Sequence, residues 1–276
     1  MTTHTDARAM AARTYDAAAD SFDHPANGFW DRFGRWTVER LELAKGARVL
    51  DACCGTGASA LPAAERVGPE GHVLGVDVSE GLLALARAKA AKRGWRHTEF
   101  RAGDVMELDA PAASFDAVVC VFGIFFVPDM RGAVRELWRR VKPGGKLAIT
   151  TWGPDVFAPL NSFFWSEVRA VRPDLHRAFN CWDALTDPAA VRELVSVTGV
   201  EPHVEPEAAR HSLRSPEDAW ALLQGTGYRG TLEQLDPAAR IRIREACLRF
   251  IHESGVDSVT ADVIYAVATK GIPRAS

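Results

Sequence analysis

The segment 49–57, with the sequence VLDACCGTG, most restricts the folds that this chain can adopt. Its apolar start is typical of a buried strand, and Gly55 and Gly57 then form a turn before the alanine-rich, helix-like segment 58–67. Glycines allow a ligand to approach the backbone closely because they carry no Cβ. The N-terminus of the following helix offers free N–H groups and the positive end of a dipole. We therefore predict a strand–turn–helix unit that binds a nucleotide-type cofactor.

Short β-rich runs alternate with helical patterns through the first half of the chain. We expect strands over 47–52, 72–77, 98–102, 115–121 and 146–151. The helices expected between them cover 61–66, 81–93 and 130–141. This alternation predicts an α/β fold, a parallel sheet with helices on both faces. Right-handed crossovers then place the carboxyl ends of the strands, and the ligand, at one edge of the sheet.

Helical patterns flank this core on both sides. The expected helices outside it cover 7–19, 29–43, 163–172, 188–198, 216–224 and 237–254, and the late strands cover 200–213 and 259–270. We expect three parts: an N-terminal helical cap over 1–45, a cofactor-binding core over 46–152, and the remainder of the sheet over 153–276. In this last part, a helical insertion at about 214–258 would cover the substrate side.

Composition excludes several classes of function. The 276 residues are 47% hydrophobic and 25% charged, ordinary values for a soluble enzyme. A net charge of −3 provides no basic field for nucleic acid. No apolar run approaches the ~20 residues of a membrane helix, and residues 1–20 lack the features of a signal peptide. The five cysteines, without CxxC spacing, indicate reduced thiols. We expect a cytoplasmic protein without a nucleic-acid or membrane partner.

The glycine motif alone fits two cofactors. Gly55, Gly57 and Ala60, with Asp77 about 20 residues further on, also satisfy the dinucleotide pattern. However, Asp51 precedes the glycines, and its charge would repel a pyrophosphate but suits a methionine amino group and a sulfonium.

A further acid follows the third expected strand. Asp104 can accept from an adenine amine, with Val105 near the ring. Acids at three successive strand ends (Asp51, Asp77 and Asp104) favour S-adenosylmethionine (SAM) over NAD. As alternatives, Asp77 and Asp104 could be helix N-caps. Cys53 and Cys54 could be a redox pair, although adjacent cysteines seldom meet disulfide geometry.

On these motifs the chain resembles the class I SAM-dependent methyltransferases, especially the small-molecule group of menaquinone and ubiquinone biosynthesis. The segments that carry the resemblance are 49–57, 75–78, 103–105, 115–118 and 142–147. The resemblance implies a Rossmann-like, seven-stranded, mostly parallel sheet whose last strand, matched by 259–270, is antiparallel. It also implies SAM as the cofactor.

The resemblance further implies a cofactor site. Asp51 would lie near the methionine amino group, Asp77 would bind the ribose hydroxyls, and Asp104 would bind the adenine amine. The residues implied to bind the cofactor are Tyr15, Phe22, Asp51, Cys53, Gly55, Gly57, Asp77, Val78, Gly103, Asp104, Val105, Cys120, Val121 and Phe122. Cys53 departs from the family, which usually has glycine there, and its side chain narrows the room for the cofactor.

Aromatic residues mark the expected substrate side. The candidates are Phe125, Trp152, Trp165 and Tyr228, whose rings could hold a flat acceptor and attract a sulfonium. As an alternative, a helix-spaced aromatic such as Trp165 belongs to the core.

No single catalytic residue is predicted. Methyl transfer is an in-line displacement that mainly requires alignment and exclusion of water. A base is needed only when the nucleophile arrives protonated, and the candidates for that role are His24, His176, His211 and Tyr228. No metal is expected.

The leading hypothesis is an enzyme that transfers a methyl group from SAM to a small hydrophobic or aromatic acceptor at O, C or N, acting as a monomer or homodimer. Two alternatives stay open at this point. One is a catalytically silent SAM-binding regulatory subunit, and the other is an NAD-dependent oxidoreductase.

Overall fold

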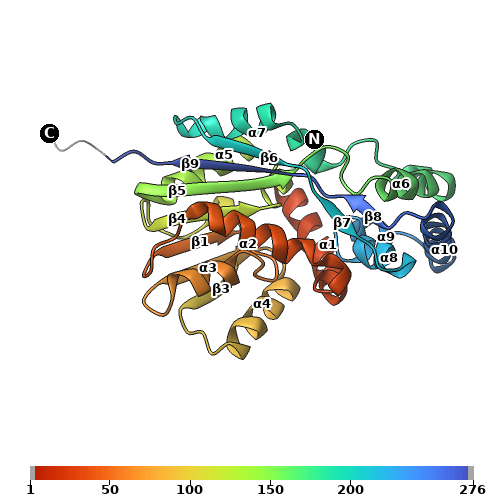
Figure 1. The fold of residues 1–276 in the computed structure, drawn as a ribbon, viewed down its shortest axis with the longest axis horizontal. Coiled ribbons are helices and arrows are strands. Elements are labelled where there is room, and N and C mark those ends of the chain that lie inside the picture. Colours follow the sequence, from red (N-terminus) through yellow and green to blue (C-terminus); the bar gives the residue numbers. More distant parts are fainter. Residues whose placement is uncertain (1–3, 273–276) are drawn as a thin grey trace.

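A seven-stranded sheet forms the centre of the computed structural model, which describes residues 4–272 (Figure 1). Its strand order is β3-β2-β1-β4-β5-β9-β6. These strands are β1 Arg48–Ala52, β2 His72–Asp77, β3 Thr98–Ala102, β4 Phe115–Val121, β5 Val141–Trp152, β6 His203–Glu207 and β9 Val263–Thr269. The strands from β1 to β5 pair in parallel, whereas β9 runs antiparallel to both β5 and β6. The predicted Rossmann-like sheet with an antiparallel last strand is confirmed.

Helices cover both faces of the sheet because its inner strands are apolar on both sides. Val49, Leu50 and Ala52 of β1 are all buried. One face packs against α2, α3 and α4, and the other against α5 and α7. These helices are α2 Phe29–Leu41, α3 Ala60–Val67, α4 Glu80–Lys92, α5 Met130–Arg140 and α7 Pro188–Val195. The layers hold the carboxyl ends of β1, β2, β3 and β4 at one edge.

The two late strands predicted as continuous are each broken in two. The 200–213 prediction becomes β6 and β7 Arg210–Ser212, and the 259–270 prediction becomes β8 Ser258–Thr260 and β9. β7 and β8 form a separate two-stranded ribbon. The break has a local cause at Asp262, whose Oδ1 accepts from the N–H of Ala209 at 2.8 Å in place of a ladder bond. The chain thereby leaves the large sheet and turns toward the helices beyond its edge.

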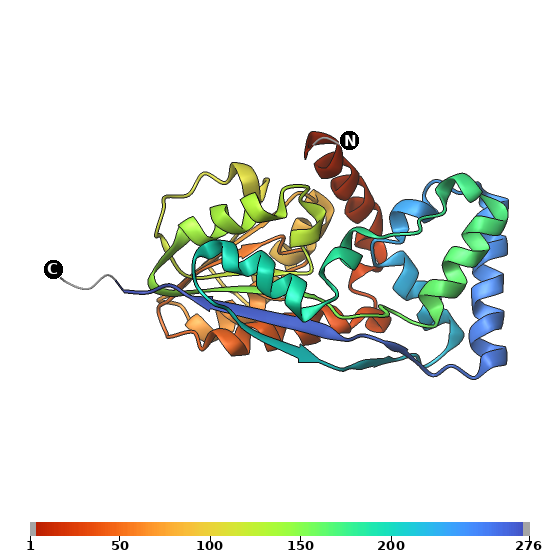
Figure 2. The same cartoon turned by 90° about the horizontal axis from the view of Figure 1, so that it is seen from above.

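A helical layer lies beyond the carboxyl ends of the strands (Figure 2). It contains α6 Leu160–Val171, α8 Pro216–Gln224, α9 Arg229–Leu232 and α10 Pro237–Ser254. The N-terminal helix, α1 His4–Phe22, joins this layer, where the Arg229 guanidinium lies 3.2 Å from the Asp20 carboxylate. α6 lies outside the predicted insertion, yet Phe163 on it stacks on Phe250 of α10 at 4.2 Å between ring centroids. Helices from distant parts of the chain therefore meet over one edge of the sheet.

Candidate active site

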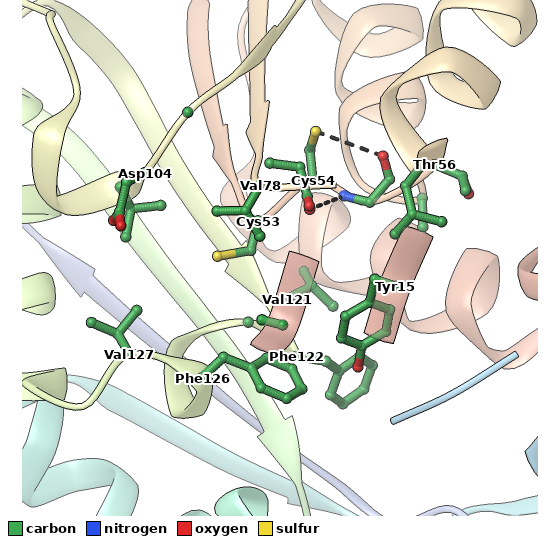
Figure 3. A pocket seen from close by; sticks show the side chains of 18 of the residues that line it. Tyr15, Cys53, Cys54, Thr56, Val78, Asp104, Val121, Phe122, Phe126 and Val127 are labelled. Atoms are coloured by element: carbon green, nitrogen blue, oxygen red, sulfur yellow. Dashed lines mark hydrogen bonds between the residues drawn. The ribbon is translucent and has the colours of Figure 1, made fainter. Parts of the chain in front are cut away.

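A pocket opens where the strand ends meet α1 (Figure 3). The space between its atoms, including solvent at its open mouth, is about 930 Å³. The predicted cofactor residues that line it are Tyr15, Phe22, Cys53, Gly55, Asp77, Val78, Gly103, Asp104, Val105, Val121 and Phe122. Figure 3 shows the rings of Tyr15, Phe122 and Phe126 on one side, and Asp104 with Val127 on the other. The structure thus brings most of the predicted cofactor residues together.

The glycine loop after β1 is held by Asp77. Cys53, Gly55 and Gly57 have φ values of 60°, 53° and 88°, so the loop follows a left-handed path that favours glycine. The Oδ2 of Asp77 accepts from the N–H of Gly55 at 2.8 Å, and its Oδ1 accepts from the N–H of Ser79 at 2.9 Å. Asp77 is therefore not the N-cap of α4, a role that Ser79 fills. Burial raises the pKa of Asp77, and these backbone donors oppose that rise.

Asp104 combines the two roles that the sequence left open. Its Oδ1 accepts from the N–H of Met106 at 2.9 Å and caps a short 3₁₀ helix, Val105–Glu107. Its Oδ2 lies 2.7 Å from Nε2 of His4 and 3.8 Å from Nε of Arg8, both on α1. Asp104 is therefore an N-cap whose second oxygen remains directed to the α1 side of the pocket.

Asp51 is buried behind the pocket and does not line it. Its Oδ2 accepts from the hydroxyl of Ser59 at 2.7 Å, and Ser59 does line the pocket. Within residues 4–272, its Oδ1 is a buried oxygen without a hydrogen-bond partner. Burial raises the pKa of Asp51 to about 7, against the opposing effect of the Ser59 hydroxyl. Asp51 therefore reaches the pocket through Ser59.

We expect Asp51→Asn to flatten the pH dependence of stability. The folded-state pKa, about 7, exceeds the unfolded value of about 4. Between these values the folded chain keeps a proton that the unfolded chain releases, so the free energy of unfolding falls as pH rises and levels off above 7. Relative to wild type, Asp51→Asn should gain on the order of 2–3 kcal/mol between pH 5 and pH 8.

Urea unfolding at both pH values measures this difference. Asp31→Asn, at an exposed position on α2, serves as the control and should show the wild-type slope. If Asp51→Asn and wild type had the same pH dependence, Asp51 would titrate normally in the folded protein.

Cys53 contacts two neighbours that share its space. Its thiol lies beside that of Cys120, and this neighbour together with burial raises the pKa of Cys53 well above the ordinary value. A Cβ on Gly123 would overlap the Cβ of Cys53 and would lie 2.8 Å and 3.2 Å from the sulfur atoms of Cys53 and Cys120. Cys120, a predicted cofactor residue, thus lies behind Cys53 rather than in the pocket wall. Gly57 likewise does not line the pocket; its N–H bonds to the carbonyl of Cys54.

Several residues that line the pocket, on α1 and in neighbouring segments, were not predicted from the sequence. His4, Arg8 and Ala11 line the pocket together with the predicted Tyr15, at the three- and four-residue spacing of one helix face. The other residues missed include Trp30, Thr56, Ser59, Leu82, Phe126 and Val127. The helical spacing was a readable signal for the α1 face, but the rest depends on tertiary contacts.

A second, aromatic cavity adjoins the first. It is narrow, with about 280 Å³ between its atoms even when open solvent is included, and it shares Tyr15, Trp30, Phe122 and Phe126 with the first pocket. Three predicted substrate residues, Phe125, Trp152 and Tyr228, line it. Trp152 stacks on Phe122, with ring centroids 4.0 Å apart and planes inclined by 15°.

Trp165, the fourth predicted substrate residue, does not line the aromatic cavity. It is only 7% exposed and lines a polar groove beside His176, outside the aromatic cavity.

The three histidines among the candidate bases line neither cavity. Nδ1 of His24 accepts from the N–H of Ala26, and Nε2 of His211 lies 2.6 Å from the carbonyl of the same residue. Burial lowers the pKa of His211. His176 belongs to the polar groove. Tyr228 lines the aromatic cavity, but its hydroxyl donates to Oδ1 of Asn161 at 2.8 Å, and burial raises its pKa.

Residues 4–272 contain neither a cluster of metal ligands nor a membrane-spanning helix. Over residues 4–272, no group of three or more His, Cys, Asp and Glu side chains could hold a metal ion. No helix in that range is long and apolar enough to span a membrane.

Comparisons with known proteins identify the family. The methyltransferase domain family matches residues 49–145. The aklanonic acid methyltransferase DauC of Streptomyces sp. is 32% identical over 185 residues, which cover 63% of this chain and 84% of that protein. The chain therefore belongs to the SAM-dependent methyltransferase family. The predicted cofactor, SAM, is confirmed by this membership, and the dinucleotide interpretation of the glycine motif is set aside.

Two further comparisons describe the extent of the likeness. The demethylmenaquinone methyltransferase of Listeria monocytogenes is 43% identical over 121 residues. That match covers 44% of this chain and about half, 51%, of the relative. Phosphoethanolamine N-methyltransferase 2 of Haemonchus contortus, solved with S-adenosylhomocysteine, shares the fold with a TM-score of 0.59 and 22% identity. The matched region covers 96% of this chain and 60% of the Haemonchus chain.

Proposed function

We propose that this protein transfers a methyl group from SAM to a small, flat, aromatic or hydrophobic acceptor. The observation that carries the proposal is the pair of adjoining cavities, one lined by strand-end acids and the other by aromatic rings, with Tyr15, Trp30, Phe122 and Phe126 as common walls. Such a pair provides for two ligands whose reacting groups meet at the shared wall. The aklanonic acid and demethylmenaquinone methyltransferases among the relatives support an acceptor of this kind.

The polar groups of the first pocket fit the cofactor. Asp77 and Asp104 supply buried carboxylate oxygens for ribose hydroxyls and for the adenine amine, and Val78 and Val105 supply apolar contacts beside the ring. The buried Asp51 carboxyl lies behind Ser59, on the side assigned to the methionine amino group, whose positive charge would favour the ionised form. When bound, the cofactor supplies a methyl group already activated by a sulfonium.

The chain's own contribution to the reaction is alignment and protection from water. The aromatic walls present π faces, which attract a cation and exclude solvent. Holding two reactants in line accounts for a large part of the barrier reduction that such a transfer needs.

Calorimetric titration with S-adenosylhomocysteine and separately with NAD tests the cofactor. We expect micromolar binding of the first and none of the second. Transfer of label from methyl-tritiated SAM to flat quinones and phenols, extracted into organic solvent, tests the reaction. Binding without transfer to any flat acceptor would favour the silent subunit, and binding of NAD alone would refute the proposal.

A further inference from the structure

The aromatic cavity contains almost no group that can take a proton. Of the described residues that line it, only Tyr15 and Tyr228 are titratable. Burial is the main cause of the raised pKa of Tyr15, and the nearby Cys181 thiol adds to it. Asp77 and Cys53, which lie on the cofactor side, raise the same pKa further. Burial is also the main cause of the raised pKa of Tyr228, and the negative charge of Asp183 adds to it. Neutral, strongly buried phenols are poor bases near pH 7, so a nucleophile that arrives protonated would keep its proton here.

The cavity is instead supplied with hydrogen-bond donors that have no partner. The indole N–H groups of Trp30 and Trp182 are buried and unpaired among residues 4–272, and both side chains line the cavity. Trp182 is only 8% exposed. The hydroxyls of Thr226 and Tyr228 are already used, because they donate to Leu222 and Asn161. A buried donor without a partner carries a free-energy cost that a ligand oxygen would remove.

From these two observations we infer that the acceptor is a planar oxygen acid, such as an acidic phenol, an enol conjugated to a carbonyl or an aromatic carboxylic acid, which enters already ionised. This inference rests on the proposed methyl transfer. The acceptor leaves its proton in solution. The indole N–H of Trp182, with that of Trp30, then donates to an oxygen of the anion, and the neighbouring sulfonium compensates its charge.

The electron balance of the step needs no enzyme base. The electron pair of the oxyanion, or of its conjugate carbon, forms the new bond to the methyl carbon. The bond between that carbon and sulfur breaks, and its electron pair stays on sulfur as a neutral thioether. An amine fits less well: an aliphatic amine arrives as an ammonium that needs a base, and the N–H groups of a neutral aromatic amine need acceptors, whereas the free groups of Trp30 and Trp182 are donors.

Two matched probes test this inference: 2-hydroxy-1,4-naphthoquinone, which is an ionisable enol, and 2-amino-1,4-naphthoquinone, which has the same shape. Their binding to the S-adenosylhomocysteine complex can be measured by calorimetry, so the readout does not depend on turnover. We expect the hydroxy probe to bind at least tenfold more tightly at a pH where it is ionised. Its affinity should follow its own ionisation and not a fixed pKa of the protein.

The chain offers a matched pair of variants. Trp182→Phe removes the N–H and keeps a ring. We expect it to lower the affinity for the hydroxy probe roughly tenfold or more and to change the affinity for the amino probe little. Trp165→Phe removes an equally buried and unpaired indole N–H outside the cavity, and it should change neither affinity. Unchanged S-adenosylhomocysteine binding in both variants shows that the fold is intact.

The outcomes separate this inference from the proposed function. Equal losses in Trp182→Phe and Trp165→Phe, or tighter binding of the amino probe, would overturn the inference even if methyl transfer occurs. Tight, Trp182-dependent binding of the hydroxy probe without any methyl transfer would support the recognition of an oxyanion but refute the proposed enzyme. Where transfer is measurable, the pH midpoint of kcat/KM should move with the pKa of each substituted hydroxyquinone.

Discussion

Gly123→Ala is expected to lose most of its affinity for S-adenosylhomocysteine and about 2–3 kcal/mol in the free energy of unfolding. The added methyl would overlap the Cβ of Cys53 and press on the sulfur atoms of Cys53 and Cys120, at 2.8 Å and 3.2 Å. Gly123 itself has φ −114° and ψ −33°, which alanine adopts freely, so backbone strain at this residue does not contribute. The loss of stability would come from overpacking. The loss of affinity would follow because the added methyl pushes Cys53 into the space that the cofactor would occupy.

The same geometry predicts a rescue. Cys53→Gly removes the atoms that the methyl would overlap and places glycine at a φ of 60°, where it is favoured. The double variant should therefore recover most of the affinity and stability that Gly123→Ala loses. Calorimetry and urea unfolding of both singles and the double give the coupling energy. Gly28→Ala, where the new Cβ would meet only the carbonyl of Pro25 at 3.5 Å, serves as the control. Additive effects of the two substitutions would mean that the clash with Cys53 is not the cause.

Asp77→Ala is expected to weaken S-adenosylhomocysteine binding by about 1.5–3 kcal/mol, the scale of a lost hydrogen bond to a charged group. The carboxylate lines the pocket and also holds the glycine loop through the N–H of Gly55 at 2.8 Å. Its removal would therefore take away an acceptor for the ligand and loosen the loop that the ligand contacts.

Asp77→Asn separates these two contributions. The amide keeps one oxygen for the N–H of Gly55 but loses the charge and the second acceptor, so we expect an affinity between those of wild type and Asp77→Ala. Calorimetric titration gives the affinities, and circular dichroism melting checks that each variant is folded. Wild-type affinity in a folded Asp77→Ala would remove Asp77 from the cofactor site.

Much of the fold was predictable because local pattern and topology agree there. The alternation through residue 152 predicts the parallel part of the sheet, and the acids at its strand ends were expected to meet at one edge. The break between β6 and β7 was not predictable, since it depends on a side-chain bond from Asp262 to a distant N–H. Sequence periodicity contains no information on such a bond.

The candidate site shows the same division. Asp77 and Asp104 could be placed from their positions after strands, but the contact of His4 with Asp104 depends on how α1 crosses the sheet edge. The charge state of Asp51 also escaped prediction, because its pKa follows from complete burial rather than from residue type. Trp165 and Trp182 look alike in the sequence, and only tertiary packing places Trp182 in the aromatic cavity and Trp165 outside it.

The common walls of the two cavities have a consequence for inhibitor design. Tyr15, Trp30, Phe122 and Phe126 face both spaces, so a single layer of side chains separates the two ligand volumes there. A single molecule in which an adenosine group is joined by a short tether to a planar anion would occupy the cofactor pocket with one end and the aromatic cavity with the other. Its second end would bind at the high effective concentration that a short linker creates, so its affinity would exceed that of either half alone.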